Sequence, residues 1–298
     1  MELFGSSRSM AFTVEGFSLR MLVFTGKKIE SWYSVPLNPT WIRDGQVASP
    51  GDVGRVMAET IKGKDLPSKG VVSAMPSTGS TSQVLTLPRL QKRDLDKTVA
   101  WEMKRLMPGS TDIDYIYWQA MPWKATKLQM AVFALAVPVT NVQNLVNACR
   151  AAGVTMKGME LKPFSLVRAV NCERGVIVHG EIDNVEIVVV DRSSPALFRA
   201  IPVKETAASP DSAAQIILRE LPFTIDYYNR AHPESSLAPD SAVYLSGSLA
   251  LEPDILSKVT KATGRTVMRV EPPPGCPENF PLEQQLVNVG LMLKTKWD

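Results

Sequence analysis

The sequence predicts an α/β protein built as two lobes or as one large domain. Strand-like and helix-like segments alternate along the chain, an order that is typical of α/β architectures. With 298 residues, of which 45% are apolar, the chain is long enough to bury a sizeable core. The clearest local signal lies at residues 175–191, where a short apolar run, a polar turn beginning at His179 and a largely β-branched run follow one another. Because β-branched residues fit a pleated sheet, this segment predicts a β-hairpin.

Residues 1–80 predict a strand meander followed by a helix and a buried strand. Residues 11–24 contain two short strand-like runs, and residues 28–37 extend the meander. The pair Ser49-Pro50 opens a segment in which apolar residues follow helical spacing. The apolar run 71–76 then ends at a proline, as expected for a buried strand.

Residues 81–155 predict a compact inserted module in the order β-α-β-β-α. The strands are expected at residues 83–87, 114–121 and 127–137, and the helices at residues 94–107 and 139–152. Aromatic residues gather in this module: Trp101, Tyr115, Tyr117, Trp118 and Trp123. Such residues either mark a peptide-binding groove or form a core, and the sequence leaves both interpretations open.

The rest of the chain predicts a second alternation of strands and helices. Strands are expected at residues 156–161, 198–203, 243–248 and 266–270, and helices at residues 163–170, 212–230, 252–263 and 282–294. The two hairpin-led halves of the chain are loosely similar, and no other internal repeat is visible in the sequence.

The composition gives little support for nucleic-acid or membrane binding. Lys and Arg number 33 against 30 Asp and Glu, a net charge of +3, and no basic run is interleaved with aromatics. The longest apolar stretch, residues 128–138, falls well short of the roughly 20 residues that span a bilayer. The N-terminus lacks the apolar core of a signal peptide, so we expect a cytosolic protein whose three widely spaced cysteines are reduced.

Few residue patterns in the chain carry chemistry. No nucleophile-elbow, P-loop or dinucleotide-binding motif occurs. His179 and His232 are the only histidines, and no third ligand is placed near either, so we expect no histidine-based metal site. Glu181, Asp183 and Glu186 are clustered acids that would suit Mg²⁺, but a solvated turn is the interpretation we favour.

Short segments spread along nearly the whole chain follow the order found in one known family. These segments are Thr13–Arg20, Val35–Leu37 with Arg43–Gly45, Ser73–Pro76, Leu87-Pro88, Trp101-Glu102, Met107-Pro108, Ala151–Gly153, Glu160–Leu166, Leu245–Gly247 and Val289–Leu291. In this order they resemble the PilM family of type IV pilus assembly proteins, which are actin-like relatives of the cell-division protein FtsA.

The resemblance implies an actin-like, ribonuclease H-like two-lobed ATPase fold with an inserted small α+β subdomain. The first lobe would comprise residues 1–80, 156–172 and 278–298. The inserted subdomain would comprise residues 81–155, and the second lobe residues 173–277.

The resemblance also implies where a nucleotide would bind. The positions are Thr13, Glu15, Gly16, His179, Glu181, Glu220, Ser246 and Gly247. The family's aspartates correspond to Thr13 and His179, and its glycines to Glu15 and Glu181, while Ser248 replaces a further glycine. Acids at these turns would repel a triphosphate, and the turns lose the glycines that let a backbone cradle phosphate. We therefore expect a pseudo-ATPase with no catalytic residue, no metal ligand and no cofactor, and keep binding of ATP with Mg²⁺ as the alternative.

The function that the resemblance implies is a cytoplasmic scaffold of type IV pilus assembly, peripheral at the inner face of the cell membrane. In the family, a groove holds the N-terminal cytoplasmic peptide of an inner-membrane partner, PilN, and the protein also contacts the pilus assembly ATPase complex. For this chain we expect Gln83 and Leu85 to lie on a strand that pairs with the peptide. Trp101 and Arg105, four residues apart on one helix, are expected to form the pocket wall.

Two rival interpretations remain. One is a functional ATP-binding ATPase of the pilus or of a type II secretion-type machine, in which Glu15, Glu181 and Asp183 would be metal ligands. The other is the degenerate actin-like domain of a type II secretion protein, which normally continues into a transmembrane helix.

Overall fold

The computed structural model describes residues 7–106, 115–121, 126–204 and 208–295. Trp123 and the Met107-Pro108 pair, both used in the sequence-based predictions, lie outside these ranges. The chain divides into a larger unit, Met1–Thr78 with Asn147–Asp298, and a smaller unit, Gly79–Val146. The smaller unit ends within a helix that the sequence had placed wholly in the insert.

The first sheet of the larger unit has the strand order β10-β6-β1-β2-β3. Its strands are β1 (Arg8–Glu15), β2 (Ser18–Thr25), β3 (Lys28–Pro36), β6 (Lys69–Met75) and β10 (Thr155–Leu161). The first three form the predicted antiparallel meander, and β6 and β10 run parallel to β1. Gly16 and Phe17 connect β1 to β2 with φ angles of 55° and 57°. Two positive φ angles suit the twist of a two-residue hairpin, so Glu15 is held at the end of β1, opposite Ser18.

The second sheet of the larger unit has the order β13-β12-β11-β14-β15. Its strands are β11 (Arg174–Gly180), β12 (Asn184–Asp191), β13 (Ser194–Pro202), β14 (Val243–Ser246) and β15 (Val267–Arg269). The predicted hairpin is confirmed, but the turn does not begin at His179, because this residue is buried within β11. The next strand also begins before residue 198, because Arg192 and Ser193, with φ angles of 52° and 55°, make another two-residue turn.

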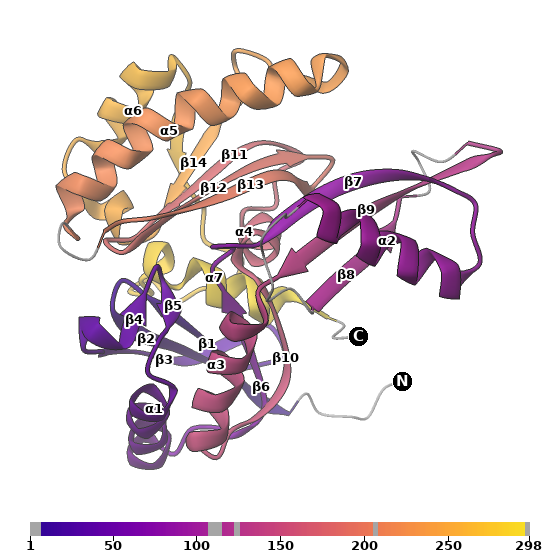
Figure 1. The fold of residues 1–298 in the computed structure, drawn as a ribbon. Helices are drawn as coiled ribbons and strands as arrows, with labels where there is room; N and C mark the ends of the chain where they lie inside the picture. Colours follow the sequence, from indigo (N-terminus) through magenta and orange to yellow (C-terminus); the bar gives the residue numbers. More distant parts are fainter. Residues whose placement is uncertain (1–6, 107–114, 122–125, 205–207, 296–298) are drawn as a thin grey trace, which may run out of the picture. The chain divides into compact units, whose positions relative to one another are not determined.

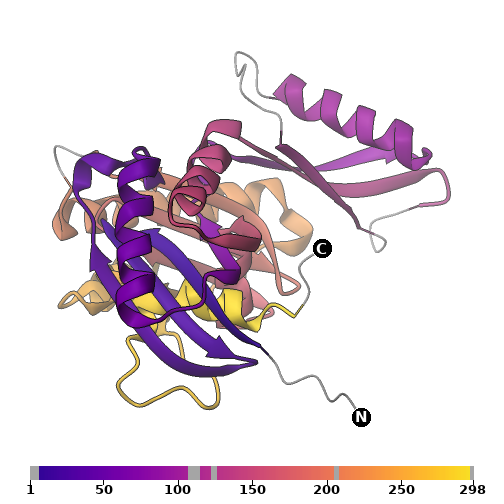
Figure 2. The same cartoon turned by 90° about the horizontal axis from the view of Figure 1, so that it is seen from below.

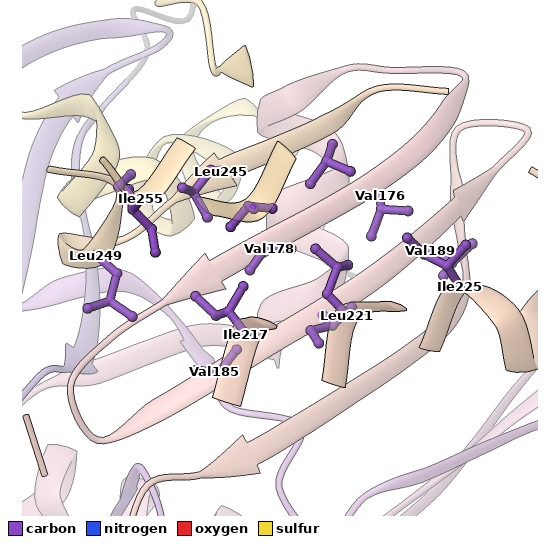
Figure 3. Packing of buried hydrophobic residues seen from close by; sticks show 14 of the residues in the cluster. Val176, Val178, Val185, Val189, Ile217, Leu221, Ile225, Leu245, Leu249 and Ile255 are labelled. Carbon is purple, nitrogen blue, oxygen red and sulfur yellow. The ribbon is translucent and has the colours of Figure 1, made fainter. Parts of the chain in front are cut away.

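Helices α5 (Pro210–Ala231) and α6 (Ile255–Thr263) cover one face of this second sheet (Figure 1). Figure 3 shows the core between them, with Val185 and Val189 of β12 directed toward Ile217 and Ile225 of α5. The segment before α6 forms a 3₁₀ turn, η5 (Ser248–Leu251), and α6 begins later than the sequence predicts. The left-handed conformation of Asp254, with a φ of 59°, explains the late start.

Helices α4 (Lys162–Val170) and α7 (Leu282–Leu293) pack against each other between the two sheets. Helix α7 contacts β1, β2 and β6 of the first sheet, and α4 contacts strands of both sheets. The helices approach closely at Gly290, where an added Cβ atom would lie 2.0 Å from the carbonyl oxygen of Ser165. This glycine is therefore required for the packing that joins the two sheets.

The smaller unit contains a three-stranded sheet with the order β7-β9-β8. Its strands are β7 (Thr81–Pro88), β8 (Tyr115–Ala120) and β9 (Gln129–Val137), and α2 (Lys92–Leu106) covers one face (Figure 2). Leu95, Val99 and Met103 of α2 pack on this face, as their helical spacing predicts. Strand β7 lies at an edge of the sheet.

The remaining elements lie in the larger unit, except for the first part of α3, which belongs to the smaller unit. They are α1 (Pro50–Lys64), α3 (Val139–Ala151), the short strands β4 (Ile42–Arg43) and β5 (Gln46–Val47), and the 3₁₀ turns η1 (Pro39–Trp41) and η4 (Pro233–Ser235). Helix α1 and the end of α3 lie side by side (Figures 1 and 2), and Gly54 provides the space for this contact, because an added Cβ would meet Ala148 and Ala151 at 2.6 Å.

Candidate functional site

Seven titratable side chains are buried where β1, β2 and α4 meet the β11–β12 hairpin. They are Glu15, Arg20, Lys162, His179, Glu181, Asp183 and Glu186, and none is more than 4% exposed. We call this set the junction cluster. It joins the two sheets of the larger unit at the turns where the sequence placed the eroded nucleotide site.

Arg20 of β2 and Glu181 of the hairpin form a bidentate ion pair within the junction cluster. The two terminal guanidinium nitrogens donate to the two carboxylate oxygens at 2.7 and 2.8 Å. Ser248 of η5 donates to the same carboxylate through its backbone N–H at 3.0 Å and its hydroxyl at 2.6 Å. Burial alone would raise the pKa of Glu181, but Arg20 outweighs this effect and holds the pKa below its usual range. The carboxylate therefore remains ionised in the interior.

Glu15 is the second ionised carboxylate of the junction cluster. It accepts from Lys162 Nζ at 2.9 Å and lies 2.8 Å from His179 Nε2, while the Thr13 hydroxyl donates to its other oxygen at 3.0 Å. Burial would raise the pKa of Glu15, but Lys162, followed by His179 and Arg20, holds it well below the usual range. The other ring nitrogen of His179 lies 3.0 Å from the hydroxyl of Ser246, so the histidine links β11 to β14 as well as to β1.

Asp183 and Glu186 are less completely partnered. One oxygen of Asp183 accepts the N–H of Gly16 at 3.1 Å, and one oxygen of Glu186 accepts the N–H of Ser77 at 3.1 Å and the Ser77 hydroxyl. The second oxygen of each carboxyl has no hydrogen-bond partner among the described residues. Burial raises the pKa of both groups, and Lys162 opposes this only in part. Two acids with lowered pKa values thus face two cations, Arg20 and Lys162, and two acids with raised pKa values lie beside them.

The ion pairs of the junction cluster attach the first sheet of the larger unit to the second. Both oxygens of Glu15 and of Glu181 already accept hydrogen bonds from side chains of the protein. Within the described ranges, no group of three or more His, Cys, Asp or Glu side chains is placed to hold a metal ion. The proposed solvated turn at Glu181, Asp183 and Glu186 is wrong, because all three side chains are buried.

Replacing Asp183 with asparagine is expected to stabilise the protein by an amount that grows as the pH rises. Burial raises the pKa of Asp183 above its ordinary value of 3.8, so the folded protein favours the protonated carboxyl. Below pH 3.8 the folded and unfolded states both carry a protonated Asp183, and the carboxyl does not destabilise the fold. As the pH rises through the raised pKa, the unfolded state gains the favourable ionisation and the unaltered protein loses stability. Asparagine still accepts from Gly16 but does not ionise. Urea unfolding of both proteins from acidic to neutral pH measures the difference. Asp240→Asn, in an exposed loop, is the control, and a stabilisation by Asp183→Asn that is the same at every pH would contradict the expectation.

Most of the sequence-predicted nucleotide positions lie together in the structure. Thr13, Gly16 and Ser246 contact members of the junction cluster, as described above. Gly247 has a φ of 82°, and a Cβ atom there would lie 2.2 Å from the carbonyl oxygen of Gly180. Glu220 lies apart on α5, where it pairs with Arg199 at 3.1 Å and Arg219 at 2.8 Å. No interaction within the described chain joins Glu220 to the junction cluster.

The sequence-based prediction missed the two cations, Arg20 and Lys162. Arg20 is the only charged residue within the apolar strand 18–25, and Lys162 is the first residue of α4, a helix whose one other charged residue, Arg168, lies in its last turn. A single cation at an inward position of an apolar element signals a buried acid nearby. The acids at the two turns, Glu15 on one and Glu181, Asp183 and Glu186 on the other, are the partners that these two cations indicate.

The residues expected to bind a partner peptide divide into exposed and buried ones. Gln83 is exposed on the edge strand β7, whereas Leu85 is buried in the core beneath α2, so the side chain of Leu85 is not available to a partner. Trp101 is 62% exposed, and the Arg105 guanidinium lies 5.5 Å from the centre of its ring. The alternative interpretation of Trp101 as a core residue is therefore wrong.

The sequence matches the family model described as type IV pilus assembly protein PilM over residues 19–197. No curated protein matches the chain. Among the helices that the structure describes, none has the length and apolar character needed to cross a bilayer.

Several solved structures are similar to this chain over nearly its whole length. A PilM–PilN type IV pilus biogenesis complex has a chain with 17% identity and a TM-score of 0.78, covering 97% of this chain and 98% of that one. The cytoplasmic domain of EpsL, an inner-membrane component of the type II secretion system of Vibrio cholerae, has 10% identity and a TM-score of 0.55, with 97% of each chain covered. A Bacteroides thetaiotaomicron protein with an actin-like ATPase fold and unknown function has 8% identity and a TM-score of 0.55, with 98% of each chain covered. The fold of this chain is therefore actin-like, as the sequence predicted.

Proposed function

Because the chain belongs to the family of the type IV pilus assembly protein PilM, we propose that it is a scaffold of pilus assembly that works without ATP. The scaffold would bind the N-terminal peptide of a PilN-like inner-membrane protein. It would lie in the cytoplasm at the inner face of the membrane, held there by this partner, and would also contact the pilus assembly ATPase complex.

One observation carries the proposal that ATP is not used: protein side chains fill the junction between the two sheets. The carboxylates of Glu15 and Glu181 occupy the turns that the family resemblance assigns to phosphate groups. An added Cβ at Gly16 would lie 2.6 Å from a Glu181 carboxylate oxygen, so little space is left beside this turn. A triphosphate would have to displace two ionised carboxylates from buried cations, and breaking such a buried pair costs several kcal/mol.

The smaller unit offers the features that a peptide-binding surface needs. An extended peptide can pair its backbone with a sheet edge, and β7 is an edge strand that carries the exposed Gln83. Trp101 and Arg105 are stacked on the exposed side of α2 and are residue types that often dominate binding energy. The similar PilM chain was solved in complex with PilN, which supports a peptide of this class as the partner.

Replacing both Trp101 and Arg105 with alanine is expected to weaken binding of the partner peptide by roughly thirtyfold, or about 2 kcal/mol. The physical reason is the loss of a large aromatic surface together with the cation stacked on it. The affinity is measured by fluorescence anisotropy with a labelled peptide that has the N-terminal sequence of a PilN-like protein from the same organism.

A matched control is Leu128→Ala, which removes another exposed apolar side chain of the same unit, one that is 83% exposed. Circular dichroism checks that each variant is folded. Normal binding by the folded double variant would place the peptide elsewhere on the protein. Absence of binding to the unaltered protein would contradict the proposed partner.

A further inference from the structure

The β11–β12 hairpin supplies three carboxylates that each accept a backbone N–H group from a different turn. Glu181 accepts from Ser248, Asp183 from Gly16, and Glu186 from Ser77, at distances between 3.0 and 3.1 Å. The three donors come from segments far apart in the sequence: η5 after β14, the β1–β2 turn, and the loop after β6. Carboxylates of one hairpin therefore satisfy backbone N–H donors in three separate turns.

Backbone N–H groups at tight turns, together with an arginine fork, are the groups with which proteins bind free oxyanions. The Glu181 carboxylate has the most complete set of these donors. Its two oxygens receive both terminal nitrogens of Arg20 and both the N–H and the hydroxyl of Ser248. Arg20 also donates to the carbonyl oxygen of Gln284 at 2.8 Å, which fixes the guanidinium relative to the start of α7.

We propose that the β11–β12 hairpin is an internal anionic ligand, and that the donors around Glu181 form an oxyanion site filled by the chain itself. This inference rests on the proposed function without ATP, and it identifies the Glu181 carboxylate as the anion that takes the place of the nucleotide. The carboxylates attach the second sheet to Arg20 of the first sheet and to Gly16 and Ser77, in the connections that follow β1 and β6. The two sheets are thereby held together without any external ligand.

The space around Arg20 and Ser248 holds one anionic group at a time. While the Glu181 carboxylate is present, its contacts with Arg20 and Ser248 exclude a second anion. Replacement with alanine removes the carboxylate and its adjoining methylene but leaves every donor in place. Acetate supplies the removed atoms, whereas inorganic phosphate supplies a larger, tetrahedral oxyanion with the same hydrogen-bond chemistry.

The test is thermal unfolding of Glu181→Ala in increasing sodium acetate or sodium phosphate, each against sodium chloride of equal ionic strength. The variant is expected to melt at a lower temperature than the unaltered protein, and acetate is expected to restore several degrees in a saturable manner. A larger effect of phosphate than of acetate would identify the site as one for tetrahedral oxyanions. No response to either anion beyond that of the unaltered protein would overturn the proposal.

Two further variants keep the result interpretable. Glu181→Gln keeps the side-chain volume and leaves no space, so acetate should not stabilise it. Arg20→Met combined with Glu181→Ala removes the main donor and should abolish the acetate response. If Glu181→Ala does not fold in chloride, its refolded yield in acetate replaces the melting temperature, and a yield independent of acetate counts against the site.

Titration of the unaltered protein with ATP and Mg²⁺ separates this inference from the proposed function. Stabilisation of the unaltered protein by ATP would contradict the ATP-free scaffold. Failure of acetate to restore Glu181→Ala, in a protein that does not respond to ATP, would contradict only the internal ligand.

Discussion

Replacing Arg20 with methionine is expected to lower the free energy of unfolding by about 3–5 kcal/mol. The substitution keeps most of the side-chain volume but leaves the ionised Glu181 carboxylate buried without its cation. It also removes the hydrogen bond from Arg20 to Gln284, which connects β2 to α7. Urea unfolding followed by circular dichroism measures the change.

The matching control is Arg55→Met in α1, where the ion pairs with Asp52 and Glu59 are exposed to solvent. Exposed pairs contribute about 0–1 kcal/mol, so this variant should unfold almost as the unaltered protein does. The double variant Arg20→Met with Glu181→Leu should recover most of the lost stability, because no uncompensated charge then remains. Equal losses from Arg20→Met and Arg55→Met would show that Arg20 and Glu181 are not a buried pair.

Replacing Gly290 with alanine is expected to cost about 3 kcal/mol or more, at the upper end of the range for overpacking. The added Cβ would lie 2.0 Å from the Ser165 carbonyl oxygen, a backbone atom that cannot rotate away. Helices α4 and α7 would have to separate, and both of them contact the strands of the larger unit. The melting temperature and the urea midpoint both report this loss.

Gly63→Ala in α1 is the control, because nothing lies within 4 Å of a Cβ atom at that position. Alanine is favoured over glycine in a helix, so this variant should gain up to about 1 kcal/mol. The same chemical change thus has opposite signs at the two positions. A neutral or stabilising effect of Gly290→Ala would mean that α4 and α7 do not approach as closely as described.

The fold was predictable from the sequence because local patterns and long-range packing agree in most segments. The β-branched run of residues 185–190 forms β12, in the interior of the second sheet, and the periodic apolar residues of α2 face the core of the smaller unit. The errors arise where backbone conformation decides a boundary. Residues 192 and 193 shorten the turn before β13, and Asp254 delays α6, through positive φ angles that no apolar pattern reveals.

The candidate site was only half predictable. The resemblance located the two turns, and Glu15, His179 and Glu181 are together in the structure. The sequence treated the acids of the second turn as solvated, because burial of a charge depends on cations that are far away in the chain. Arg20, 161 residues from Glu181, supplies the positive charge at Glu181, and Lys162 supplies it at Asp183 and Glu186. Only the three-dimensional fold brings these cations to the acids.

Calorimetric titration of the unaltered protein with ATP and Mg²⁺, up to near-millimolar nucleotide, tests most directly whether side chains have replaced the nucleotide. If the carboxylates of Glu15 and Glu181 fill the junction, no saturable heat should be observed with or without Mg²⁺. A saturable, Mg²⁺-dependent heat that is lost in Glu181→Ala would contradict this account, because it would show that the acids hold a metal and a nucleotide and that the protein is a functional ATP-binding member of its family.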